Sequence, residues 1–191
     1  MIRIDRRRFA GLLAAALAVV AGMAIAQSGA TAGASHVKAV FTQMGVPVEG
    51  RFTRFEANVN FDPATPAAAR ARIVVDTASF ELGPGAEEYA AETRRPEWFD
   101  VERHPQAVFE ASGAKLVAEG RYEFAGRLQM KGRSAEVSGP FTLAQADGGS
   151  VFEGEVPISR LAFGIGDGEW RDTSILADEV RVRFRIVVAS P

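Results

Sequence analysis

The sequence predicts an all-β protein in which one antiparallel sheet closes on itself, with one short helix inserted between strands. Segments in which apolar and polar residues alternate with a period of two recur along the chain, separated by turn-forming residues. One segment, PGAEEYAAETRRP, breaks this rhythm with a charge pattern typical of a helix. The 191 residues, 47% of them apolar and none of them Cys, suffice for one domain whose core needs no disulfide.

Residues 1–26 predict a cleaved signal peptide. The basic segment MIRIDRRRF precedes an uncharged apolar run, and Ala24-Ile25-Ala26 forms a small-residue cleavage site. A membrane anchor is the alternative, but the run is short for a span of about 20 residues. Arg6-Arg7-Arg8-Phe9 fits a twin-arginine signal, and a Sec signal is the alternative. We expect residues 27–34 to form a flexible lead and residues 35–191 to form the barrel domain.

The charge of the chain argues against two classes of partner. The whole chain carries a formal net charge of -2, and residues 1–26 contain four Arg and one Asp, a net +3, which leaves -5 for the remainder. A negative protein is repelled by phosphate groups. We therefore expect neither nucleic acid nor an anionic membrane surface as the main partner.

About eight strands are predicted, each by its alternation. In chain order these strands are HVKAVFT, FEANVNFD, RARIVVD, AVFEAS, RYEFAGRLQMK, AEVSGPFTL, VFEGEVPI and VRVRFRIVV. In the last strand, residues 180–188, the apolar side chains of Val180, Phe184 and Ile186 share one face, and three Arg share the other. The apolar face of this strand then lines a filled core, an interface or a cavity.

The segments between the strands also contain sequence signals for strand ends and helices. Asp62-Pro63 ends one strand, and Thr65 before Pro66 is expected to cap a short helical turn. In residues 84–96, early Glu and late Arg followed by Pro predict a helix of about ten residues. Trp98 and Phe99 follow it and are expected to plug one end of the barrel.

Catalytic and metal-binding signals are weak. The chain has only two His, and His104 lies near Asp100 and Glu102, so a carboxylate and imidazole site is one reading and a solvated loop is the favoured one. Glycines in FGIGDGEW are followed by a strand instead of a helix, which favours a turn over a phosphate loop. The three Arg of the last strand are read as a solvated exterior, with an anion site as the alternative.

The order of several motifs resembles the YceI-like proteins. The motifs are QMGVPVEGRF, FEANVNFDP, VVDTASFELG, WFDVERHPQAVFEAS, GRLQMKGRS and ISRLAFGIGDGEW, and the resemblance extends from Ser35 to Val188. It implies a lipocalin-like, eight-stranded antiparallel β-barrel in the periplasm whose lumen binds a polyisoprenoid or an isoprenoid quinone. It also implies no catalytic residues, and it suggests a b-type cytochrome of the inner membrane as a partner.

Two positions depart from the resemblance. Many YceI-like proteins have an aromatic segment before the position of Ser35, where this chain has GATAGA. Many also have His immediately before the glycine that is Gly45 here, whereas this chain has Met44. We expect Met44 to replace a polar contact with a softer apolar wall.

The resulting expectation is a binding protein, not an enzyme, that carries or stores an isoprenoid lipid. No cofactor or metal is expected, and a homodimer is left open. Alternatives are a quinone-holding accessory of the cytochrome, a lipid-modifying or oxidant-scavenging enzyme using His104, and a solid barrel that serves only for interaction. The expected ligand-binding residues are Phe41, Phe55, Val59, Phe61, Ile73, Val75, Phe109, Leu128, Met130, Phe141, Phe152, Ile158, Phe184 and Ile186, with Trp98, Phe99, Phe163 and Trp170 at the mouth or plug.

Overall fold

The computed structural model describes residues 28–29, 34–83, 85–146 and 149–189. The predicted signal peptide lies outside these residues, as does most of the predicted lead, although Ser28–Gly29 of that lead form a short strand, β1. The limits predicted for the signal peptide, lead and domain therefore stay predictions. No helix in the described ranges has the length and apolar character required to span a membrane.

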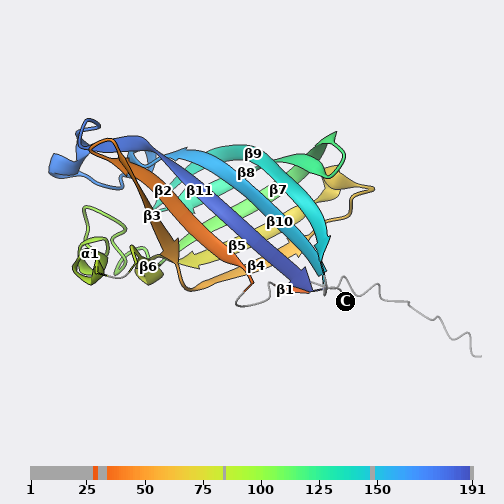
Figure 1. The fold of residues 1–191 in the computed structure, drawn as a ribbon, viewed down its shortest axis with the longest axis horizontal. Helices are drawn as coiled ribbons and strands as arrows, with labels where there is room; N and C mark the ends of the chain where they lie inside the picture. The colour runs from red at the N-terminus through yellow and green to blue at the C-terminus, as the bar shows by residue number, and fades with distance from the viewer. Residues whose placement is uncertain (1–27, 30–33, 84, 147–148, 190–191) are drawn as a thin grey trace, which may run out of the picture.

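The fold is all-β, as predicted, and all of its strand pairs are antiparallel (Figure 1). The described residues form one sheet of eleven strands in the order β1-β4-β5-β7-β8-β9-β10-β11-β2-β3-β6. The bounds of the other strands are β2 His36–Gln43, β3 Val46–Phe52, β4 Phe55–Asn60, β5 Arg70–Asp76, β6 Phe80–Glu81, β7 Gln106–Ala118, β8 Arg121–Met130, β9 Arg133–Ala146, β10 Gly149–Ser159 and β11 Leu176–Ala189.

The strand count differs from the expected eight in three places. Strands β1 and β6 are only two residues long, too short to produce an alternating pattern. Strand β3 was missed because Pro47 and Gly50 interrupt its alternation. Pro47 nevertheless lies opposite Thr42 of β2, and Gly50 lies opposite Ala39. The sequence signals for turns therefore hid a paired strand.

The sheet curls into a barrel whose hydrogen bonding is not continuous. Strands β3 and β4 follow each other in the chain, but the described pairings do not join them. The seam is bridged near Thr53, whose backbone N–H donates to the Ser79 carbonyl at 3.1 Å. Aromatic packing also covers this region, since the Phe52 and Phe80 rings lie 5.0 Å apart.

The inserted helix is present but shorter than expected. Helix α1 covers Glu87–Glu92, and turns replace the rest of the predicted ten residues. Pro96 cannot continue a helix, and the Phe99 N–H turns back to donate to the Thr93 carbonyl at 3.0 Å. The remaining helical turns are 3-10: η1 Pro66–Ala68, η2 Thr77–Ser79, η3 Leu161–Phe163 and η4 Gly168–Arg171. Thr65 makes no side-chain cap for η1, contrary to the prediction.

Alternation sorts the side chains of the barrel into an apolar interior and a charged exterior. On β8, Tyr122, Phe124 and Met130 are buried, whereas the residues at the alternate positions, such as Glu123 and Arg127, are exposed. Outside, the arginine row of β11 lies on the exterior that the sequence favoured, and it forms ion pairs with β10, where Arg183 donates to Glu155 at 2.5 Å. Because such surface pairs contribute only about 0 to 1 kcal/mol each, interior burial is the main determinant of register.

Candidate ligand-binding cavity

The barrel encloses a cavity of about 300 Å³ lined almost entirely by apolar side chains. This volume is at the lower end of the range of roughly 300 to 1,000 Å³ found for small-molecule sites. On β11 the lining extends from Leu176 to Ile186, an advance of about 33 Å at about 3.3 Å per residue. The cavity is therefore long and narrow and follows the strands.

Most residues that the sequence nominated for ligand binding line this cavity. They are Phe41, Val59, Phe61, Ile73, Val75, Trp98, Phe99, Phe109, Leu128, Met130, Phe141, Phe152, Ile158, Trp170, Phe184 and Ile186. Parity brought the residues on strands to one interior surface, whereas Trp98, Phe99 and Trp170 reach it from loops at one end of the barrel. That these side chains contact a ligand stays a prediction.

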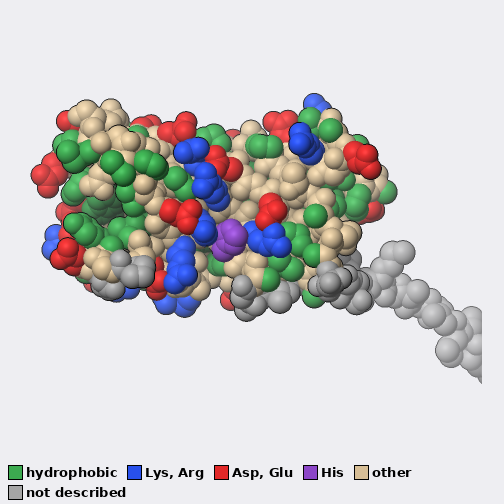
Figure 2. All heavy atoms as spheres, viewed as in Figure 1, with side chains coloured by type: hydrophobic (Ala, Val, Ile, Leu, Met, Phe, Trp, Pro, Cys, Tyr) green, Lys and Arg blue, Asp and Glu red, His purple; other side chains and the backbone are tan. Residues whose placement is uncertain are grey.

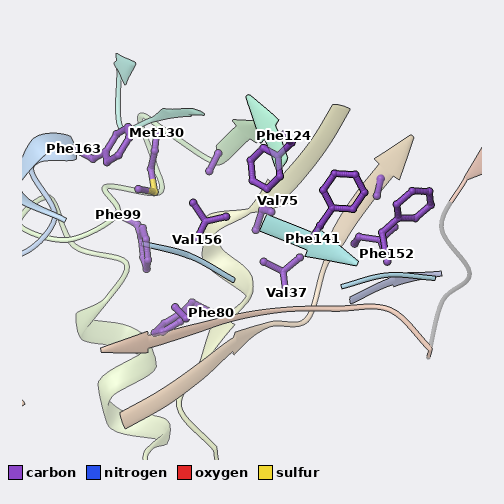
Figure 3. Packing of buried hydrophobic residues seen from close by; sticks show 14 of the residues in the cluster. Val37, Val75, Phe80, Phe99, Phe124, Met130, Phe141, Phe152, Val156 and Phe163 are labelled. Atoms are coloured by element: carbon purple, nitrogen blue, oxygen red, sulfur yellow. The ribbon is translucent and has the colours of Figure 1, made fainter. Parts of the chain in front are cut away.

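Phe55 and Phe163 lie outside the cavity wall. Phe55, the first residue of β4, is partly buried and packs against the core cluster. Phe163 is 2% exposed and belongs to η3, where its N–H donates to the Arg160 carbonyl at 3.2 Å. In Figure 3 Phe163 lies beside Met130, beyond the end of the strand interior. Both side chains support the wall instead of forming it.

Aromatic clusters occupy both ends of the interior. At one end, the Phe61 ring makes edge contacts with Tyr122, Phe141 and Phe152 at centroid distances of 5.0 to 5.6 Å. At the other end, the Phe80 ring contacts Phe99 at 5.5 Å. Figure 3 shows Val37, Val75 and Val156 between these two ends. The middle of the lumen thus combines aliphatic side chains with Phe rings such as Phe124 and Phe184, whose centroids lie 6.1 Å apart.

Interior glycines make room for some of these rings. A Cβ on Gly126 would lie 2.7 Å from Phe109 Cε2, and one on Gly154 would lie 2.6 Å from Phe184 Cζ. A Cβ on Gly50 would lie 2.2 Å from Phe80 Cζ, and Phe80 was a lining residue that sequence reasoning missed. The glycine at the inward position of β3 was the only signal for it. These glycines allow rings to lie flat against the wall and leave the lumen open.

The cavity opens at the end of the barrel that carries α1. Tyr89 of α1 lines the cavity and is also 53% exposed, so the cavity reaches the surface there. Figure 2 shows a recess walled by apolar side chains at this end. Trp98 and Trp170 lie beside the opening with ring centroids 5.4 Å apart. Trp98 Nε1 is shielded from solvent and has no hydrogen-bond partner within the described ranges.

A buried arginine that sequence reasoning missed holds the loops of this opening. Arg160 is 2% exposed, and its burial lowers the pKa of the guanidinium. Its side chain donates at 2.6 to 3.1 Å to the backbone carbonyls of Ala177, Ile165, Gly166, Trp170 and Leu176. A Cβ on Gly166 would lie 2.6 Å from Arg160 Nη1. Arg160 therefore positions the loop that carries Trp170.

The weak catalytic candidates do not converge. Asp100 is buried and forms an ion pair with Arg103 at 2.8 Å. Across the described ranges, no three His, Cys, Asp or Glu residues are grouped so that they could hold a metal ion. The glycine loop adopts left-handed turns, with φ of 68° at Gly164 and 73° at Gly166, and leads into the four-residue η4 instead of a long helix. It forms the turn that the sequence favoured.

Met44 does not form part of the apolar wall, contrary to expectation. It lies in the turn between β2 and β3 and is 76% exposed. Its neighbour Gln43 lines the cavity instead. The chain reverses direction at Met44 and Gly45, with φ of 48° and 80°, which directs the Met44 side chain outward.

These features define a small antiparallel β-barrel that encloses an apolar cavity. A family model described as the YceI-like domain matches residues 29–188, and the chain belongs to this family. It is similar to the crystal structure of BcnA from Burkholderia cenocepacia, with 42% identity and a TM-score of 0.79 over 84% of this chain and 99% of that one.

More distant proteins are also similar to this chain. A polyisoprenoid-binding domain from Saccharophagus degradans, implicated in plant cell wall breakdown, is 14% identical with a TM-score of 0.68 over 86% of this chain and 99% of that one. A UPF0312 protein of Azotobacter vinelandii is 29% identical over 83 residues, which is 44% of this chain and 42% of that protein. The chain thus matches less than half the length of this curated relative.

Proposed function

We infer that this protein binds an isoprenoid lipid in its barrel lumen and stores or transports it in the periplasm. The observation that carries this proposal is the long, narrow, apolar cavity with an opening beside α1. The polyisoprenoid-binding domain of the same fold supports the ligand class. The predicted signal peptide supports the location.

The size of the hydrophobic effect favours an extended ligand. Burying ten carbons contributes roughly 8 kcal/mol before any cost is subtracted. Association itself costs an estimated 4 to 15 kcal/mol, so a small apolar molecule binds marginally in a site with few polar contacts. A chain of several isoprene units buries more surface and overcomes this cost. The length of the lining along β11 suits such a chain.

A charge placed in the lumen tests the proposal. We expect Leu128→Glu to abolish isoprenoid binding, because a buried carboxylate in an apolar lumen has no partner. Gln129→Glu is the matched control, since Gln129 is the next residue of β8 and is exposed. Titration with a fluorescent prenol and mass spectrometry of an organic extract from the native periplasm provide the measurements.

Folding of the variants is checked by circular dichroism and thermal unfolding. If Leu128→Glu does not fold, Ala71→Leu narrows the same lumen without a charge and is expected to weaken binding. Unchanged binding in either folded lumen variant, or an extract of the native protein with no lipid, contradicts the proposal.

A second candidate function is to hold an isoprenoid quinone for a b-type cytochrome of the inner membrane. The observation that favours it is Trp98 Nε1, a shielded donor without a partner beside the opening. The carbonyl oxygen of a quinone is an acceptor for the hydrogen bond that this N–H group does not otherwise make. Reduction of a bound quinone on mixing with the cytochrome would distinguish this role from passive carriage.

A further inference from the structure

Exposed apolar side chains gather around the opening of the cavity. The described residues include six large apolar side chains that are exposed, and four of them are Met44, Val46, Tyr89 and Ile175, at 76%, 61%, 53% and 39% exposure. The backbone N–H of Met44 donates to the Ile175 carbonyl at 2.7 Å, so two of the loops are joined. In Figure 1 the β2–β3 turn and α1 lie at the same end of the barrel.

These four residues, which we call the mouth patch, are continuous with the cavity. Gln43 precedes Met44, Leu176 follows Ile175, and both line the cavity. Tyr89 belongs to the patch and to the lining. Figure 2 shows apolar side chains around the recess at this end. An apolar molecule that crosses the patch therefore reaches the lumen directly, past the few polar side chains of the lining, such as Gln43 and Glu92.

The backbone at Met44 is unfavourable for this residue type. Met44 and Gly45 both have positive φ, 48° and 80°, as in the two-residue hairpin turns that favour Asn-Gly. A left-handed backbone conformation is costly for residues with bulky side chains. Asn and Asp adopt it more readily. The side chain recovers none of this cost by burial, since it is 76% exposed. An apolar residue at this strained and exposed position suggests a partner outside the fold.

The charges around the mouth patch select the kind of partner. Arg95 pairs with Glu92 at 3.1 Å, and Arg171 pairs with Asp167 at 2.9 Å, so both cations are compensated. Exposed Glu88 adds negative charge next to Tyr89. These paired charges and Glu88 give the patch little attraction for an anionic surface. A membrane surface without net charge fits it better.

We propose that the mouth patch docks on the surface of a zwitterionic lipid bilayer and inserts Met44, Val46, Tyr89 and Ile175 between the headgroups. Apolar side chains together with Tyr and Trp are the residues that settle at a membrane interface. Docking places the cavity opening against the layer in which an isoprenoid is dissolved, so the ligand transfers without passing through water. This inference depends on the proposed function for the nature of the cargo.

Replacement of Met44 by Asn tests the docking. We expect Met44→Asn to lower partitioning to phosphatidylcholine vesicles about tenfold, because apolar surface is lost from the insertion site. The melting temperature of the protein should stay the same or rise, since Asn-Gly suits the turn. Co-sedimentation with vesicles and thermal unfolding measure the two effects. Added phosphatidylglycerol should not strengthen binding.

The opposite end of the barrel provides a matched control. Leu116 near the end of β7 is also exposed, at 53%, and Leu116→Asn should leave vesicle partitioning unchanged. Equal partitioning of Met44→Asn and the unmodified protein overturns the proposal, as does equal weakening by Leu116→Asn. A dimer on gel filtration that Met44→Asn dissociates also overturns it, because a second copy then covers the patch.

Ligand binding is measured separately, with a prenyl quinone dispersed in water and no vesicles. We expect Met44→Asn to bind it as the unmodified protein does. An unmodified protein that sediments with vesicles but binds no prenyl quinone refutes the proposed function and leaves docking established. A protein that binds the quinone but does not sediment refutes docking alone.

Discussion

At the scale of single residues, Trp98 distinguishes a ligand with a polar headgroup from a pure hydrocarbon. Its Nε1 donor is shielded and without a partner across the described ranges, and such a donor loses its hydrogen bonds to water without replacement. We expect Trp98→Phe to weaken binding of a prenyl quinone about 3- to 10-fold more than binding of an isoprenoid hydrocarbon. Equal weakening for both ligands, measured by titration, would assign Trp98 a packing role only.

Trp170→Phe serves as the control for this variant. It removes similar ring area from the same pair and leaves Trp98 Nε1 in place. We expect it to reduce binding of the two ligands by the same factor. The comparison thus separates the hydrogen bond from the apolar contact.

At the scale of elements, the pairing of β2 with β11 makes stability depend on pH. Burial lowers the pKa of His36 at the start of β2, and the charges of Lys38 and Arg185 lower it further. His36 therefore binds a proton more readily in the unfolded chain than in the folded protein. As a result, the free energy of unfolding falls as pH decreases below about 6.5, and it levels off below the pKa that His36 has in the folded protein. The effect is below about 1 kcal/mol, because the side chain is only partly buried and solvent screens these charges.

We expect His36→Gln to remove this component between pH 7 and pH 5. Urea unfolding at several pH values measures it. The window lies above the range in which Glu49 and Glu155 titrate, since hydrogen bonds from Lys38 and Arg183 lower the pKa of those carboxyls. If the free energy of unfolding changes with pH in His36→Gln as it does in the unmodified protein, other groups cause the pH dependence.

The elements also show which parts of the fold the sequence could predict. Strand β11 was predicted because every second residue from Val180 to Val188 is apolar and no turn residue interrupts the row. Strand β8 was predicted although Gly126 occupies one of its inward positions, because four large apolar residues keep the alternation. Strand β3 was missed because Pro47 and Gly50 resemble turn signals, although Gly50 is needed to admit the Phe80 ring. The lining followed from parity, but Arg160 did not, since only the folded loops bring five carbonyls around it.

At the scale of the whole molecule, the cavity couples stability to ligand binding. An empty apolar cavity forfeits packing contacts, and a bound ligand stabilises the folded state by about 2.7 kcal/mol when its free concentration is 100 times the dissociation constant. For a domain of this size we expect removal of lipid to lower the melting temperature by about 5 to 10 °C. Extraction with organic solvent, refolding and calorimetry with and without added prenol measure the change. A solid barrel would give the same melting temperature in both states, because it has no space in which a ligand could restore the missing contacts.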